Sequence, residues 1–453
     1  MAQKSLKKLL LSASIATALA FSWSGSVMAD GDEITALEQR IVELENLVHQ
    51  LLQDKQTSAP AAAPSTAAVE AKAEAAAEAK VEAMIAQHQE EEAAKKKKHS
   101  FKVGGYVKLD TIYSDYSDGS YSGLGRDFYI AGTVPVGGSG ESYLDFHAKE
   151  SRINFRSTHL LDNGARLGAF IEMDFLATGT GNERVSNSYA PRLRHAFVTY
   201  NNWLFGQTWM TFFNVGALPE NLDFVGPAES TIFGRQAMIR YTSGNWQFAL
   251  ENPETTITPY GGGGRIVTDD NNVPDAVLRY NLKGDWGSFT AAGIYRQLRY
   301  ENSAAGIDDS TNSYGISLSG KFVFGNKDDF RWMASTGKGL GRYMGLNTAN
   351  GAVIDGDGNL QTIDSTGIFG SYRHLWSDKW RSNLTLGYLM VDNDTDLTGL
   401  GVTKEASSLH FNLIYSPQPK LDFGAEIMYA DREIESGTDG NLTRLQFSAK
   451  YAF

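Results

Sequence analysis

Hydrophobic and polar residues alternate in short segments from Phe101 to the end of the chain. The last nine residues, LQFSAKYAF, place Leu445, Phe447, Ala449, Tyr451 and Phe453 on one face of a strand and mostly polar residues on the other. The same period of two recurs in RINFR (152–156), RLGAFIEMDF (166–175), WRSNLTLGYLM (380–390) and LDFGAEIMYA (421–430). The pattern predicts that residues 101–453 are almost entirely β-strand.

The segments between these predicted strands alternate in length. Seven short turns are expected at 162–164, 201–202, 243–245, 283–286, 326–328, 377–379 and 417–420. Eight long loops are expected at 114–143, 178–189, 211–234, 253–273, 302–310, 339–361, 394–403 and 434–440. Alternating short and long connections between an even number of strands are typical of an outer-membrane barrel, and a soluble sandwich has no reason to show them. We therefore predict an all-β transmembrane barrel of about 16 antiparallel strands.

The first 29 residues have the features of a secretory signal peptide. Lysines precede the apolar run Leu9–Phe21, and Val27 and Ala29 are the small residues before an expected cut at Asp30. A membrane anchor is the alternative, but the apolar run is short and a cleavage site follows it.

A heptad seam follows the expected cleavage site, in residues 30–56. Its a and d positions are Ile34, Leu37, Ile41, Leu44, Val48 and Leu51. This core favours two strands, whereas RIVELE (40–45) resembles a pattern of short three-stranded coiled coils. We predict a periplasmic trimeric coiled coil, with a single amphipathic helix as the alternative. Residues 57–100, rich in Ala, Pro, Glu and Lys, are expected to be a linker or a helical spacer.

Composition limits the possible functions. The chain has no Cys and a net charge of −12, which gives no support for disulfides or nucleic-acid binding. Its eight His are scattered without metal-ligand spacing, and no nucleophile motif accompanies them. We expect no enzyme activity, no cofactor and no metal; DDNN (269–272) and DGDGN (355–359) are interpreted as solvated turns, with weak Ca²⁺ binding as the alternative.

Strand parity predicts an arginine-rich barrel interior. The residues expected to line the lumen are Arg152, Arg156, Arg166, Arg192, Arg194, Arg240, Arg279, Arg296 and Arg381. Fewer acids are expected there: Glu172, Asp174, Glu251 and Glu426. Rings of arginine in a pore select anions. The alternative is a ladder of ion pairs in which arginines and acids of the wall only neutralise one another. The assignment also assumes no β-bulge, since one bulge would reverse the parity of all residues that follow it.

Several blocks of sequence resemble the DcaP-like porin family. They are FKVGGYVKLDTIYSDY (101–116), ESRINFRST (150–158), KDDFRWMASTGKGLGRYMG (327–345) and SYRHLWSDKWRSNLTLGY (371–388), which follow the heptads and the Ala-rich spacer. The resemblance implies a trimeric sixteen-stranded porin with a periplasmic coiled coil, linked to uptake of small dicarboxylates. No binding residue is carried over, so the arginine list depends on parity alone.

By resemblance to trimeric porins, the third long loop (211–234) is expected to fold into the barrel as a constriction lined by Glu220, Asp223 and Glu229; an ordinary surface loop is the alternative. The final Phe453 resembles the signal that the barrel-assembly machinery recognises. We therefore predict a homotrimer in outer-membrane lipid that passes small organic anions, with dicarboxylates implied by the family resemblance. A porin for phosphate-type anions and a barrel-anchored envelope tether are the alternatives.

Overall fold

The computed structural model describes residues 98–453, apart from residues 122, 179–180 and 326. The expected signal peptide, the heptad segment with its six seam positions, and nearly all of the spacer lie outside the described residues. Their predicted roles therefore stay predictions.

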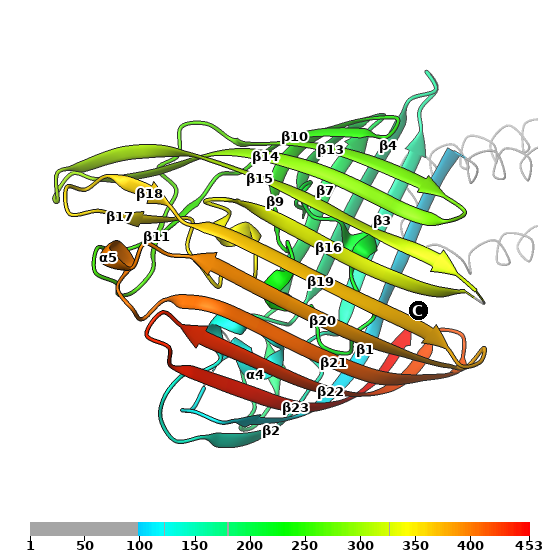
Figure 1. Cartoon of the computed structure of the whole chain (residues 1–453). Coiled ribbons are helices and arrows are strands. Elements are labelled where there is room, and N and C mark those ends of the chain that lie inside the picture. Colours follow the sequence, from blue (N-terminus) through cyan, green and yellow to red (C-terminus); the bar gives the residue numbers. More distant parts are fainter. Residues whose placement is uncertain (1–97, 122, 179–180, 326) are drawn as a thin grey trace, which may run out of the picture. The chain divides into compact units, whose positions relative to one another are not determined.

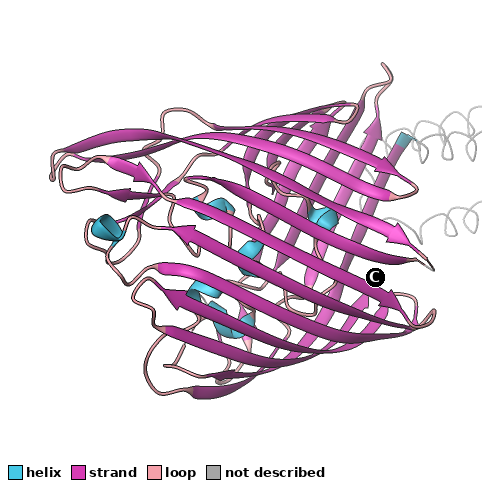
Figure 2. Cartoon of the chain, in the orientation of Figure 1, coloured by secondary structure: helices cyan, strands magenta, loops and turns pink. Residues whose placement is uncertain are grey.

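The described chain forms a closed antiparallel β-barrel (Figures 1 and 2). Its strands are β1 (His99–Tyr116), β2 (Glu141–His147), β3 (Arg152–Leu160), β4 (Arg166–Asp174), β7 (Arg192–Tyr200), β8 (Trp203–Trp209), β9 (Arg235–Ser243), β10 (Trp246–Glu251), β13 (Asp275–Gly284), β14 (Gly287–Asn302), β15 (Ile307–Phe324), β16 (Asp328–Lys338), β19 (Asp364–Leu375), β20 (Trp380–Asp392), β21 (Thr403–Gln418), β22 (Leu421–Ile434) and β23 (Asp439–Ala452).

Strand β1 closes the barrel. On one side it pairs with the last strand, β23, over Tyr106–Tyr116. On its other side it pairs first with β3 and then, nearer its end, with β2. Because β2 and β3 together occupy one position beside β1, the 17 strands make a sixteen-stranded barrel, as the sequence predicts.

The seven predicted short turns all lie at one end of the barrel, which we call the short-turn end, and the long connections lie at the other end (Figure 1). Two predicted loops at the long-loop end are shorter than expected. Within 302–310 and 434–440 only residues 303–306 and 435–438 lie outside the strands, because β14 continues to Asn302, β15 begins at Ile307, β22 ends at Ile434 and β23 begins at Asp439. Polar residues at these hairpin tips look like loop in the sequence, although the backbone pairing continues.

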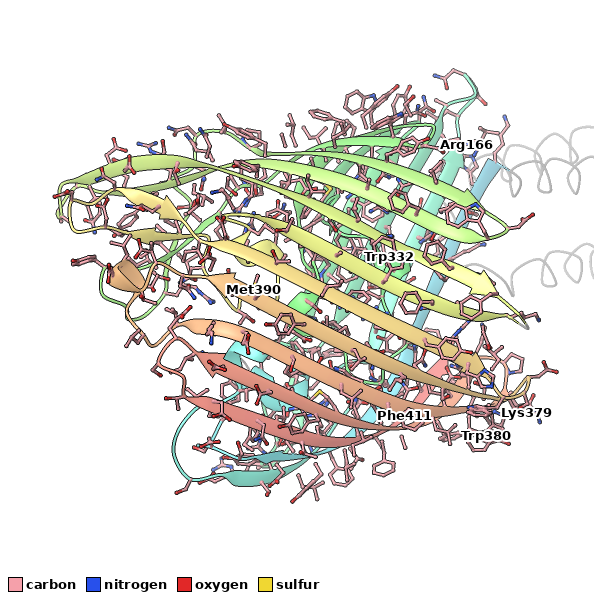
Figure 3. The ribbon with its side chains drawn as sticks, in the orientation of Figure 1. Arg166, Trp332, Lys379, Trp380, Met390 and Phe411 are labelled. Atoms are coloured by element: carbon pink, nitrogen blue, oxygen red, sulfur yellow. The ribbon has the colours of Figure 1, made fainter. Side chains whose placement is uncertain are left out.

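The outer face of the barrel is apolar. On β23, Leu445, Phe447, Tyr451 and the following Phe453 are exposed, while Gln446 and Ser448 on the opposite face are buried. Figure 3 shows Trp380 and Phe411 on the outside of the barrel. Six aromatic residues near strand ends are also exposed: Tyr200, Trp203, Trp246, Trp286, Trp376 and Trp380. Such a surface is suited to lipid, with aromatic residues at the membrane interfaces.

The long loops carry short elements of their own. They are α4 (Leu124–Asp127), η1 (Ala131–Thr133), β5 (Gly181–Asn182), β6 (Ser188–Tyr189), η2 (Val215–Ala217), η3 (Ala228–Ser230), β11 (Thr255–Thr258), β12 (Ile266–Thr268), η4 (Gly341–Tyr343), β17 (Ala352–Ile354), β18 (Leu360–Thr362) and α5 (Thr395–Thr398). Strands β11, β12, β17 and β18 form a small sheet of four. None of the helices in the described part of the chain is long and apolar enough to cross a membrane.

Candidate functional site

The segment between β8 and β9, residues 210–234, is folded into the barrel, and we call it the inner loop (Figure 1, green). Most of its residues are buried, including Phe212, Phe213, Val225 and Ile232. They join the main hydrophobic core together with residues of the barrel wall such as Phe369. Apolar residues that would be unfavourable in an exposed loop are thus explained by burial inside the barrel.

Arginines of the wall hold the first half of the inner loop. Arg240 donates from Nε to the Thr211 hydroxyl over 2.8 Å, and Arg279 donates from Nη1 to the carbonyl of Phe213 over 2.7 Å. Further round the barrel, Arg331 donates to the carbonyl of Leu218 over 2.7 Å. A loop inside a barrel leaves many backbone carbonyls without partners, and these guanidinium groups supply donors.

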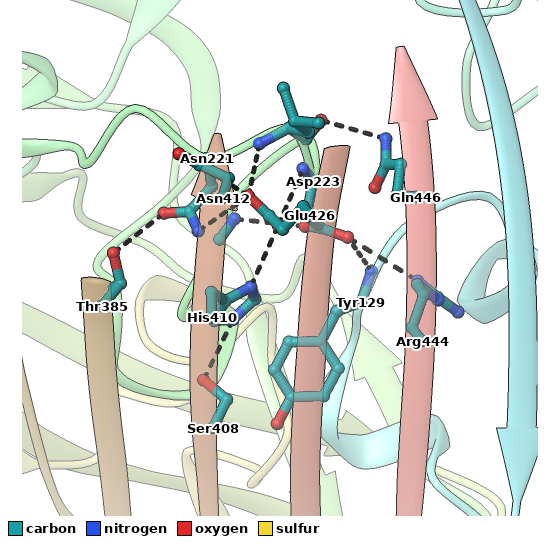
Figure 4. A network of polar contacts seen from close by, with 12 residues as sticks. Tyr129, Asn221, Asp223, Thr385, Ser408, His410, Asn412, Glu426, Arg444 and Gln446 are labelled. Atoms are coloured by element: carbon teal, nitrogen blue, oxygen red, sulfur yellow. Dashed lines mark hydrogen bonds and ion pairs between the residues drawn. The ribbon is translucent and has the colours of Figure 1, made fainter. Parts of the chain in front are cut away.

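Glu426 on β22 holds the middle of the inner loop (Figure 4). Its Oε2 atom accepts from the Leu222 amide over 2.7 Å, and the side chains of Asn221 and Asn412 donate to the same oxygen. The carbonyl of the same residue, Leu222, accepts a hydrogen bond from Lys108 of β1 over 2.9 Å. Since the carboxylate is buried and has several donors, it is a strong anchor for the loop.

The three acids predicted in the inner loop contact the barrel wall or the loop between β1 and β2. Glu220 makes an ion pair with Arg381 of β20, with Oε1 and Nη2 2.7 Å apart. Asp223 is buried and accepts from the Tyr129 amide over 2.8 Å, and the fully buried Glu229 accepts from Ser408 over 2.8 Å. The structure therefore places these carboxylates in contacts that fix the loop, and lining of a constriction by them stays a prediction.

Glycines on the inner face of the wall make room for the inner loop. A Cβ added at Gly387 would lie 2.7 Å from the Pro227 Cβ atom, and one at Gly424 would lie 2.6 Å from Leu222 Cδ2. Contacts this short do not occur between real side chains, so larger residues would push the loop away from the wall.

Strands β3, β4 and β7 make no hydrogen bond to the inner loop among the described residues. Arginines gather here. Arg192 makes a two-point contact with Asp174, with both Nε and Nη2 2.9 Å from its oxygens. The buried Arg194 donates to Glu172 over 2.8 Å and to Asp174 over 2.7 Å. Both arginines are thereby fixed in position.

Two further arginines, Arg152 and Arg235, lie beside Arg192 and Arg194. We call these four residues the arginine cluster. Arg152 lies 3.5 Å from Glu172, which Arg194 also contacts. Arg235 has no carboxylate partner among residues 98–453 as described, and its Nη1 atom is buried without an acceptor. Four guanidinium groups and two carboxylates leave the cluster with a net charge of +2.

Aromatic rings support the cluster. The Cζ atom of Arg235 lies 4.7 Å from the centre of the Trp209 ring, and that of Arg194 lies 5.5 Å from Phe224 of the inner loop. Arg156, on the same face of β3 as Arg152, lies over Phe170 at 4.9 Å, is exposed, and has no ion-pair partner in the described part of the chain. A charge held against a ring face needs no neutralising carboxylate to stay in position.

The remaining predicted arginines have other surroundings. Arg166 is exposed at the short-turn end (Figure 3). Arg296 is buried and donates to the carbonyls of Glu254, Gly339 and Leu340, so it holds loops at the long-loop end. Sequence reasoning missed Arg235. It is the first residue of β9 and directly follows the inner loop, so no earlier residue of the strand shows which face it belongs to.

The DcaP outer membrane protein family matches residues 27–453 of this sequence. The chain belongs to this family. As a member of the DcaP outer membrane protein family, the chain is an outer-membrane protein. No curated protein matches the sequence.

Two solved structures share the fold of this DcaP-family chain. The outer membrane channel DcaP of Acinetobacter baumannii is 23% identical, with a TM-score of 0.66, over 79% of this chain and 98% of that one. OmpF of Salmonella typhi, in complex with daunomycin, is 9% identical, with a TM-score of 0.50, over 78% of this chain and 97% of that one. The fold of the barrel is thus that of known channels.

Proposed function

We propose that this DcaP-family chain is a porin through which small organic anions, dicarboxylates foremost, diffuse passively across the outer membrane. The arginine cluster is the observation that carries this proposal. Three of its arginines, Arg152, Arg192 and Arg194, project from β3 and β7, which make no hydrogen bond to the inner loop among the described residues, and the cluster retains a net charge of +2. Solvent reaches the Arg152 and Arg192 side chains, which are 17% and 22% exposed.

The chemistry of the cluster suits a dicarboxylate. Guanidinium groups bind carboxylates through two parallel hydrogen bonds, and Asp174 already shows this arrangement with Arg192. A net charge of +2 balances one dianion. Phosphate-type anions offer similar oxygens and are the second candidate, since guanidinium forks accept both groups.

The assembly and orientation belong to the same proposal. The short-turn end faces the periplasm, as in other outer-membrane barrels, and residues 30–56 form a three-stranded coiled coil there after removal of residues 1–29. Residues 57–100 link this coil to the barrel of residues 101–453. Three barrels around one axis match a three-stranded stalk, which supports a homotrimer. Phe453 directs the chain to the barrel-assembly machinery.

The test is a reversal-potential measurement on the purified protein in planar bilayers under a KCl gradient. We expect a preference for chloride, and block of the chloride current by succinate at lower concentration than by phosphate. Stronger block by phosphate would favour the second candidate. Cation preference would refute an arginine-controlled pore, and absence of conductance from folded protein would favour the envelope tether.

A further inference from the structure

Two histidines face each other across β1 and β3 at the short-turn end of the barrel. His99 and His159 are directly opposite in the strand register. Their ring centres are 4.7 Å apart, and the two Nδ1 atoms are 2.5 Å apart. Both residues belong to the outward-facing row that continues with the exposed Phe101 on β1. Neither histidine contributes to the arginine cluster.

A neighbouring hydroxyl group is placed to accept a hydrogen bond from His159. Its Nε2 atom lies 2.8 Å from the Oγ atom of Ser157. When Nε2–H donates to this hydroxyl, the lone pair of Nδ1 points towards His99. Metal-ligating histidines commonly donate their second ring N–H to an oxygen in this way, which fixes the ring and its tautomer.

We propose that His99 and His159 form a two-histidine site for a divalent late transition-metal ion, with Cu²⁺ preferred over Ni²⁺ and Zn²⁺. Metal–nitrogen bonds of about 2.0 Å place two adjacent ligands of a square-planar ion about 2.8 Å apart, and those of a tetrahedral ion about 3.3 Å apart. The observed nitrogen separation requires the smaller adjustment for Cu²⁺, which the order of intrinsic affinities also favours. Water would occupy the remaining positions, since the described residues provide no group of three or more ligands.

The charge around the pair is compatible with a cation. The carboxylate of Asp162, in the turn after β3, is hydrogen-bonded to Lys98 over 2.9 Å. This contact lowers the pKa of Asp162, chiefly through the hydrogen bond and the charge of Lys98, with a smaller contribution from the nearby His99. The charges of Lys98 and Asp162 cancel, so this ion pair adds no net repulsion of a metal ion close to His99.

The test is a titration of the metal-free, full-length protein in detergent with Cu²⁺, followed by electron paramagnetic resonance. Eight histidines are present, so the number of bound ions in each variant is compared with that of the unaltered protein. We expect H99Q and H159Q each to remove the same single equivalent, and the double variant to remove no more than either. Loss of two nitrogen couplings from the spectrum would accompany the change.

Two further variants separate this site from general histidine binding. H374Q removes a histidine at the same end of the barrel, one that contacts Asp328 over 2.8 Å, and should leave the count unchanged. S157A should lower the affinity by about tenfold without removing the site, because the tautomer is no longer fixed. The proposal is refuted if the double variant, folded as judged by its heat-modifiable mobility, binds as much Cu²⁺ as the unaltered protein.

Discussion

Replacement of Arg235 by serine tests whether the arginine cluster controls selectivity. This arginine lies against Trp209 and has no carboxylate partner among the described residues, so no neighbouring carboxylate neutralises its charge. The substitution lowers the net charge of the cluster from +2 to +1. No ion pair is broken, so we expect the barrel to fold as before.

The size of the effect follows from the distance and the medium. Two unit charges about 4 Å apart interact by about 1 kcal/mol in water and about 4 kcal/mol at an effective dielectric constant of 20. Solvent reaches the neighbouring Arg152 and Arg192, whereas Nη1 of Arg235 is buried, so the value for water is the minimum expected effect. A loss of about 1 kcal/mol of attraction corresponds to roughly a fivefold fall in the permeability of the anion. Relief of cation repulsion acts in the same sense, so the anion-to-cation permeability ratio should fall by about 5- to 25-fold.

A variant of opposite sign makes the test specific. Asp174→Asn removes the carboxylate that Arg192 and Arg194 share, which raises the net charge of the cluster to about +3 and should raise the permeability ratio. Arg299→Ser is the matched control, because it removes one arginine from the β14–β15 hairpin, where Arg299 is paired with Asp308 at 2.8 Å. This control should change the ratio by less than about twofold.

The assay is the reversal potential under a KCl gradient, measured for all variants at the same salt concentration. Equal ratios for the unaltered protein, Arg235→Ser and Asp174→Asn would refute the reasoning, and selectivity would then have to arise at the loops. A change in Arg299→Ser as large as that in Arg235→Ser would have the same meaning. Heat-modifiable mobility on gels checks that each variant forms a barrel.

Three other substitutions test the architecture. Glu426→Ala removes the acceptor of the Leu222 amide, which should lower the free energy of unfolding by about 3–5 kcal/mol. The inner loop should loosen, so the single-channel current should become larger and noisier. Glu433→Ala, which breaks an exposed pair with Lys404, is the control. Gly387→Ala brings a Cβ atom against Pro227 and should destabilise the barrel by about 1–3 kcal/mol in thermal unfolding, whereas Gly401→Ala meets no atom within 4 Å and should be neutral. Phe447→Arg puts a charge on the exposed outer face and should lower the free energy of unfolding by about 2–4 kcal/mol, measured by urea unfolding from lipid vesicles. A similar loss for Phe447→Leu would contradict contact of this face with lipid.

The barrel itself was predictable because its pattern is strongly repeated. Every strand has one face towards lipid, so apolar residues recur with period two, and each short turn has a compact polar sequence. The two hairpins at 302–310 and 434–440 were harder, because beyond the membrane both faces of a strand contact water. The alternation then disappears from the sequence while the pairing continues. Strand ends outside the membrane therefore resemble loops.

The site was predictable only in part, because parity gives the face of a residue but not its partner. Arg194 and Arg279 are both on the inner side, yet Arg194 contacts carboxylates of the neighbouring strand and Arg279 holds the carbonyl of Phe213. What decides between these roles is the path of the inner loop. That path depends on long-range contacts such as Glu426 with Leu222, and no local signal in the sequence records them.

A β-bulge explains how neighbouring arginines meet in the cluster. In the register of β4 with β7, His195 lies opposite Glu172 and Leu193 lies opposite Met173, so Arg194 is the extra residue. Without the bulge, an inward Arg194 would require an outward His195. With it, Arg194 and His195 both contact Glu172 from inside the barrel, while Leu193 and Val198 are exposed outside. The bulge thus adds one inward side chain to β7, and that side chain is the buried Arg194, which joins Asp174 to Glu172.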